Sequence, residues 1–279
     1  MAVGIATDSS CDLTREQAAE IGAEIVPLSI RFGDAEYTDG VDLSVDEFYE
    51  KLASSDTLPE TAAPSPGRFE ESFRRLVEHG ATEIVCINIS SDLSATMQSA
   101  QNAARALEGT APVHVIDSHS ITMGLGSQVL AAAAAARDGA SATDVVALVE
   151  GMSARTHVFG ALDTLENLRK GGRIGGAQHL LGNLLSIKPI IDISTGRVEE
   201  AGKARTRKKA LQELAQKVLE KPKVERLCVY HGNAPDLDEF LALLAPKYPR
   251  ESIPVGKIGP VIGTHGGPRV MGATWVDPA

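Results

Sequence analysis

Two hydroxyl side chains lie where a small anion could bind. Thr61 stands in a Thr-Ala-Ala-Pro-Ser-Pro-Gly stretch, where Ser65 before a proline is expected to cap the following helix. The Thr61 hydroxyl is therefore free to donate a hydrogen bond. Ser94 follows an apolar run and is expected at the N-cap of a helix over residues 95–107, whose free N–H groups and dipole favour a carboxylate or phosphate. Both residues also fit a plain interpretation, as a loop threonine and as a helix cap.

His265 lies among three glycines, Gly263, Gly266 and Gly267. Glycines leave the backbone open and the imidazole accessible, which suits an anion partner or a proton-transfer group, the alternative being a structural histidine. A further polar segment, residues 7–10, follows the first apolar run and reads Thr-Asp-Ser-Ser. Its side chains are expected to serve turns and caps before any ligand.

Two basic segments stand out in an acidic chain. Lys and Arg total 27 against 37 Asp and Glu, and the net charge of −10 disfavours nucleic acid and anionic membrane surfaces as partners. Residues 203–209, which include Arg205, nevertheless hold five positive charges, and residues 169–173, which include Arg173, hold three. These segments are expected to dock an acidic partner or a nucleotide phosphate, the alternative being a solvated helix start.

The chain lacks the motifs G-x-x-x-x-G-K-[ST] and G-x-S-x-G of common nucleotide-binding enzymes and serine hydrolases. Its seven histidines are dispersed, so we expect neither a metal site nor a cofactor. Cys11, Cys86 and Cys228 show no C-x-x-C spacing and are expected to be reduced core residues. The start shows no signal-peptide pattern, and no run approaches the ~18 apolar residues of a membrane span. We therefore expect a cytoplasmic protein without stable membrane insertion.

Short apolar runs alternate with amphipathic stretches along nearly the whole chain, which is typical of an α/β fold with βαβ units around a parallel sheet. A chain of 279 residues predicts one large or two medium domains, and a boundary near residues 151–156 gives domains 1–155 and 156–279. The expected strands cover residues 3–7, 24–31, 84–89, 113–117, 158–162, 189–193, 226–230 and 252–257.

Capping residues mark the expected helix ends. Thr14 with Gln17, and Ser44 with Glu47, both form the pattern of a capping box. Residues 163–183 contain five glycines, which indicates tight turns or close approach of the backbone to a partner. Glycines that are expected to end helices stand at positions 22, 80, 109 and 139.

Taken in order, these segments resemble the DegV family, whose characterised members are fatty-acid-binding subunits of a bacterial fatty acid kinase. The resemblance rests on TDSSCDL, TAAPSP, ISSDLSATMQSA, LENLRKGGRIGG, KPII and IGTHGGP, and it covers essentially the whole chain. It implies a parallel-sheet N-terminal domain and a second α/β domain that enclose one acyl chain between them. It also implies a separate ATP-dependent kinase subunit, which phosphorylates the carboxyl group to give an acyl phosphate for phospholipid synthesis.

The resemblance also implies roles for single residues. Thr61 matches the threonine of the family's TSxPSP motif and Ser94 the serine of its LSGT motif, so both are similar to the donors that bind the carboxylate. His265 matches the histidine of GTHTGP, which assists transfer on the kinase complex. Arg173 and Arg205 fall in segments similar to those that face the kinase. The chain departs from the family pattern at Ala62, Ala63, Ala95 and Gly266, where Ser, Gln, Gly and Thr are more common.

Only 4% of the residues are aromatic, so a tunnel for an acyl chain is expected to have aliphatic walls. Burial of a chain such as palmitate contributes on the order of 10 kcal/mol before ordering costs, and hydrogen bonds fix the carboxylate. The leading hypothesis is a lipid-binding carrier with no catalysis of its own. The alternative is a small-molecule phosphotransferase or hydrolase that uses His265, as the related dihydroxyacetone kinase substrate domains imply. A regulatory protein that binds protein or nucleic acid is third.

Overall fold

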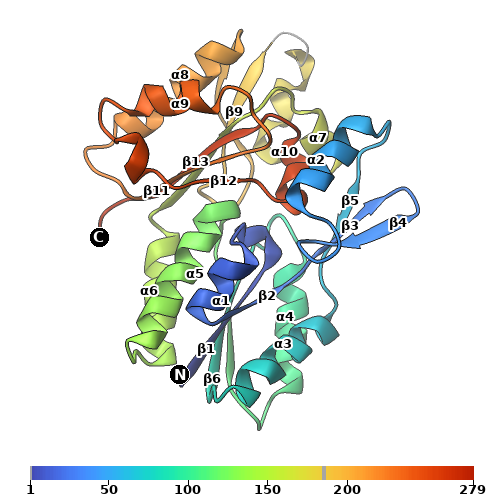
Figure 1. Ribbon diagram of the computed structural model, residues 1–279, viewed down its shortest axis with the longest axis vertical. Helices are drawn as coiled ribbons and strands as arrows, with labels where there is room; N and C mark the ends of the chain where they lie inside the picture. Colours follow the sequence, from blue (N-terminus) through green and yellow to red (C-terminus); the bar gives the residue numbers. More distant parts are fainter. Residues whose placement is uncertain (1, 184–186) are drawn as a thin grey trace.

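The computed structural model describes residues 2–183 and 187–279, which form three sheets with helices packed around them (Figure 1). The first sheet is parallel, with strand order β2-β1-β6-β7. Helices α3 and α4 pack on one face of it, and α1, α5 and α6 lie toward the other. Its elements are β1 (Val3–Asp8), β2 (Ala23–Val26), β6 (Glu83–Asn88), β7 (Val113–Asp117), α1 (Arg15–Ile21), α3 (Pro66–Glu78), α4 (Thr96–Ala106), α5 (Thr122–Arg137) and α6 (Ala142–Ser153).

The second sheet has six strands in the order β10-β9-β8-β13-β11-β12. Helices α8 and α9 cover one face, and α5 contacts β8, β11 and β13 from the other side, so α5 lies between the two sheets (Figure 1). The elements of this part are β8 (Thr156–Ala161), β9 (Lys188–Asp192), β10 (Glu199–Ala204), β11 (Glu225–His231), β12 (Val255–Lys257), β13 (Met271–Val276), α7 (Glu166–Lys170), α8 (Arg207–Leu219), α9 (Leu237–Leu244) and α10 (Pro260–Gly266).

A third, antiparallel sheet joins β3 (Ser29–Phe32), β4 (Ala35–Thr38) and β5 (Glu60–Ala62). Helix α2 (Val45–Ser54) packs against α10, and an aliphatic and aromatic cluster fills the space between them. Three short 3₁₀ segments, Ser9–Cys11, Gly175–Asn183 and Arg250–Ser252, complete the elements.

Most helix signals of the sequence are confirmed. Thr14 and Ser44 form complete capping boxes, and Ser65 caps α3 with Pro66 in its first turn. All four glycines that were expected to end helices have φ between +67° and +93°. Helix α5 is buried along most of its length because Ala and Gly allow close packing; a Cβ at Gly124 would stand 2.5 Å from Cγ2 of Val158.

The strand prediction was wrong in several places. The expected strand 24–31 is two strands in different sheets, because Pro27 has no N–H for the ladder and interrupts the run. The expected strand 252–257 begins only at Val255, after a 3₁₀ turn and Pro254. The α/β fold itself is confirmed, with a parallel first sheet, whereas the second sheet is mixed: its β11–β12 pair is parallel and its other pairs are antiparallel. Strands β4, β5, β10 and β13 were not expected at all.

Helix α6 ends at Ser153 and β8 begins at Thr156, on either side of the expected boundary. The division into domains 1–155 and 156–279 stays a prediction. The three cysteines are buried free thiols, as expected. Within the two described stretches, no helix combines the length and apolarity that spanning a membrane requires.

Candidate functional site

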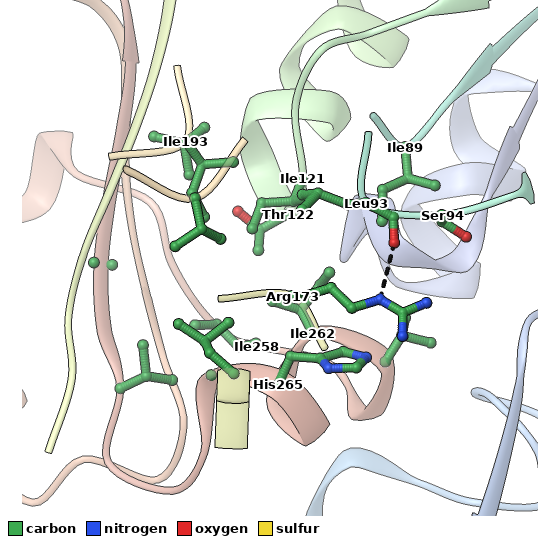
Figure 2. A pocket seen from close by; sticks show the side chains of 18 of the residues that line it. Ile89, Leu93, Ser94, Ile121, Thr122, Arg173, Ile193, Ile258, Ile262 and His265 are labelled. Carbon is green, nitrogen blue, oxygen red and sulfur yellow. Dashed lines mark hydrogen bonds between the residues drawn. The ribbon is translucent and has the colours of Figure 1, made fainter. Parts of the chain in front are cut away.

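An apolar cavity lies where the carboxyl ends of the parallel strands meet the inner face of the six-stranded sheet. The empty space within it, including the part that opens to solvent, is about 1060 Å³. Its walls are largely aliphatic, as the aromatic-poor composition predicted. Side chains that line it include Ile89, Leu93, Ile121, Ile193, Ile258 and Ile262 (Figure 2).

Polar side chains gather at one side of this cavity, opposite Ile193 in Figure 2. The hydroxyl Oγ1 of Thr61 lies 3.0 Å from the imidazole Nε2 of His265. Ser94 and Arg173 line the same part of the cavity, and the Arg173 guanidinium lies between Ser94 and the His265 ring in this view. The structure thus brings together four residues from separate segments of the chain.

Thr61 is held by a strand rather than by the expected loop. It lies in the middle of β5 and pairs with Ile30 of β3, so its backbone is fixed by the antiparallel ladder. The N-cap of α3 is Ser65, whose hydroxyl accepts from the Arg68 N–H at 3.4 Å. The expectation that the cap does not use Thr61 is confirmed, and its hydroxyl faces the cavity.

Ser94 was expected to be the N-cap of α4, but it lies one residue before the N-cap. The N-cap of α4 is Ala95, and the Ser94 Oγ accepts from the Thr96 N–H at 3.3 Å, so it still occupies a backbone donor at the helix start. Asp8 anchors the preceding loop, because its Oδ2 accepts from the Ile89 N–H at 2.8 Å. The structural interpretation of residues 7–10 fits, since Asp8 also accepts from Ser10.

His265 lies in the short helix α10. The N–H of Gly259 at its start donates to Oδ1 of Asp12 at 3.0 Å, and Asn167 of α7 donates to the Thr264 carbonyl at 3.0 Å. A Cβ at Gly171 would stand 2.4 Å from Nδ1 of His265, so glycine at this position makes room for the imidazole. The glycine-rich connection contains the tight turns that its composition indicated, since Gly172 and Gly175 have φ of +71° and +48°. The close approach at Gly171 is to the chain's own imidazole and not to a partner.

Burial lowers the pKa of His265 to about 4, and the positive charge of Arg173 acts in the same direction. The imidazole is therefore neutral near pH 7. Its Nδ1 is buried and has no hydrogen-bond partner among the described residues. When Nε2 carries the proton it donates to Thr61, and the Thr61 hydroxyl proton is then available to an acceptor in the cavity.

Arg173 was expected at a docking surface, and the structure places it at the cavity instead. Its Nε donates to the Leu93 carbonyl at 3.1 Å (Figure 2), and its Nη1 donates to the Gly171 carbonyl at 2.7 Å. The side chain thereby ties the glycine-rich connection to the loop that carries Ser94. Its charge makes it a candidate carboxylate ligand, which sequence reasoning did not recognise because the neighbouring charges suggested a surface patch.

Arg205 lies outside the cavity, exposed between β10 and α8. The basic segment around it is less free than expected, because Arg207 is half-buried and forms a bidentate pair with Asp236 at 2.8 and 3.0 Å. Thr122, the first residue of α5, also lines the cavity, and its φ of +48° turns the chain there. Nothing in the local sequence indicates that conformation for a β-branched residue.

The comparisons with known proteins agree with this geometry. A family model described as "Uncharacterised protein, DegV family" matches residues 2–277. A DegV domain-containing protein of Deinococcus radiodurans is 37% identical over 98% of this chain and 97% of its own length. A DegV family protein of Thermus thermophilus, solved as fatty acid binding, is 33% identical with a TM-score of 0.90 over 100% of both chains. A stearic-acid-binding protein of Eubacterium ventriosum is 28% identical with a TM-score of 0.88 over 98% of both chains. The family model and the extent of these matches show that the chain belongs to the DegV family.

Proposed function

We propose that this protein binds a long-chain fatty acid such as palmitate in its cavity and presents the carboxylate to a separate ATP-dependent kinase subunit. The kinase converts the carboxylate into an acyl phosphate for phospholipid synthesis in the cytoplasm. The observation that carries the proposal is the polar cluster of Thr61, Ser94, Arg173 and His265 at one side of an otherwise aliphatic cavity.

Each part of the cavity has a task in this proposal. The aliphatic walls supply affinity, because each buried methylene contributes about 0.8 kcal/mol before ordering costs. The hydroxyls of Thr61 and Ser94 donate to the carboxylate, and Arg173 balances its charge. The neutral His265 orients the Thr61 hydroxyl and lies beside the position that the acyl phosphate would occupy. The fatty acids that the Thermus and Eubacterium relatives bind support the same ligand class.

The hydrolase alternative finds less support in the geometry. A general-base histidine is usually oriented by an acceptor on its second nitrogen. Within the described part of the chain, Nδ1 of His265 has no such partner and lies against Gly171. A neutral histidine beside a threonine hydroxyl suits ligand orientation, so we propose that the protein acts without catalysis of its own.

Native mass spectrometry of the purified protein tests the ligand. We expect a bound mass equal to that of a long-chain fatty acid, and delipidated protein should take up added palmitate. The kinase step is tested by mixing loaded protein, ATP and the kinase subunit, and by trapping the acyl phosphate as a hydroxamate. Protein that neither carries nor takes up a fatty acid would contradict the proposal, and ATP turnover by this chain alone would favour the enzyme alternative.

A further inference from the structure

Two glycines lie side by side in the floor of the cavity, and we infer that they select the shape of the acyl chain. Gly160 of β8 pairs with Gly272 of β13, and both line the cavity. These are the two central strands of the six-stranded sheet. The inference rests on the proposed function. It names the ligand class as an acyl chain that, where it passes over the two glycines, is wider than a straight saturated chain. A cis double bond and a methyl branch both give that shape.

The backbone does not require glycine at position 160. Its φ lies outside the left-handed region. A Cβ there would stand 3.5 Å from Leu162, 3.6 Å from Ile191 and 3.8 Å from Val270, which are ordinary contacts. Gly171 is different, because its Cβ would meet His265 at 2.4 Å. Since glycine weakens a strand interior, the absence of a side chain at position 160 needs a reason other than the fold.

The residues on either side of Gly160 and Gly272 have large side chains, so the two glycines leave a gap between them. Ile191 pairs with Gly160 on one side, and Tyr230 pairs with Gly272 on the other. All four residues line the cavity, so this row of the sheet has large side chains at both ends and none in the middle. We call the gap over Gly160 and Gly272 the glycine furrow. The next row restores side chains at the centre, where Val158 pairs with Thr274.

Gly272 also lines the glycine furrow, but a side chain at this position would be crowded by the neighbouring backbone. A Cβ at this position would stand 3.2 Å from the carbonyl oxygen of Tyr230, so close backbone packing already favours glycine there. Gly160 has no such neighbour within 3.4 Å, and the three side chains nearest to its Cβ position all line the cavity. A side chain added at position 160 would therefore occupy space that is otherwise left to the ligand.

The furrow favours a chain that can fill it. A straight polymethylene chain on this floor leaves space beneath it, and the atoms around an unfilled gap lose their dispersion contacts. A chain with a kink or a branch places its extra width in the furrow and recovers those contacts. The cavity is therefore expected to bind such a chain more tightly than a straight chain of the same length.

The experiment offers delipidated protein an equimolar mixture of stearate, oleate and a stearate with a methyl branch at mid-chain. Native mass spectrometry measures the occupancy of each. We expect wild-type protein to prefer oleate or the branched acid over stearate. The preferred acid shows whether the glycine furrow accommodates a cis double bond or a methyl branch. Gly160→Val should lower that preference by about tenfold or more, since one extra methylene in an apolar pocket discriminates by roughly 10–200-fold. Gly160→Ala should give an intermediate effect.

Gly151→Val is the matched control, because a Cβ at this position in α6 meets nothing within 4 Å and lies away from the cavity. It should keep the wild-type preference. Equal occupancy of the three acids in wild-type protein, or a preference that survives both Gly160 variants, would overturn the inference. Should Gly160→Val fail to fold, Gly160→Ala decides. The proposed function fails by a different result, wild-type protein that binds none of the three acids.

Discussion

Nε2 of His265 lies 3.0 Å from Oγ1 of Thr61, although 204 positions separate the two residues in the chain. The contact joins β5 of the small antiparallel sheet to α10, which packs against α7 and α2. The hydroxyl of Tyr49 in α2 donates to the carbonyl of Ile258 at 3.0 Å and holds the start of this region in place. The polar end of the cavity is thus set by tertiary contacts and not by any local motif.

Removal of the two hydroxyls is expected to weaken carboxylate binding more than folding. Thr61→Val and Ser94→Ala should each lower fatty acid affinity by about 1–2 kcal/mol, and the double variant by more, because a charged acceptor loses its donors. Titration calorimetry with palmitate and thermal unfolding provide the two measurements. Ser65→Ala is the control, because Ser65 caps α3 from the same segment and should lower stability alone. Parallel loss of affinity and stability in the Ser94 variant would indicate a capping role instead.

Gly171→Ala is expected to displace the His265 imidazole, because the new Cβ would overlap Nδ1. Overpacking of this kind costs about 1–3 kcal/mol. Fatty acid affinity should fall along with stability. The histidine ring signals in an NMR spectrum report the displacement directly. Gly67→Ala serves as the control, because the nearest atom to its Cβ position is 3.8 Å away. An unmoved imidazole in Gly171→Ala would show that the loop relaxes instead.

The buried histidine makes stability depend on pH. Its pKa is about 4 in the folded protein against an ordinary value of 6.5, so the unfolded chain binds more protons between these values. The free energy of unfolding should therefore fall as the pH drops through this window, and His265 should account for about 3 kcal/mol of the loss. Urea unfolding at several pH values measures this. His265→Gln should flatten the dependence, whereas substitution of the exposed His79 should leave it unchanged.

Arg205 offers a test of docking that leaves ligand binding intact. Its side chain is exposed and lies outside the cavity, so Arg205→Glu should preserve the dissociation constant for palmitate. Acyl phosphate formation with the kinase subunit should fall by about tenfold, chiefly in kcat/KM, because charge reversal in a docking face slows association. Lys223→Glu, at another exposed site, is the control. If Arg205→Glu and Lys223→Glu lowered acyl phosphate formation equally, the effect would come from the overall charge of the protein and not from a specific docking surface around Arg205.

The parts of the fold with local signals could be predicted from the sequence. The capping boxes at Thr14 and Ser44, and the parallel strands β1, β6 and β7, follow from side-chain chemistry and apolar runs within a few residues. Strand β13 was not predicted in this way, because its Met-Gly-Ala-Thr-Trp-Val run shows no regular alternation of apolar and polar residues and gains its place from pairing with β8 and β11.

Short motifs pointed to three residues of the site. Thr61, Ser94 and His265 were identified from the sequence and meet at one cavity, although their local structures differ from expectation. The docking role of Arg173 stays a prediction, and its place at the cavity was not expected, since a run of charges does not indicate which side chain turns inward. The glycine furrow left no sequence signal, because only the register between β8 and β13 places Gly160 beside Gly272.

Strand β13 has a consequence for protein synthesis. It inserts between β8 and β11, and every strand that it pairs with precedes it in the chain. Thr61 and Ser94 are therefore synthesised long before β13, which completes the floor of the cavity. Under the proposed function, we expect a fatty acid to be retained only by chains that have been translated through β13.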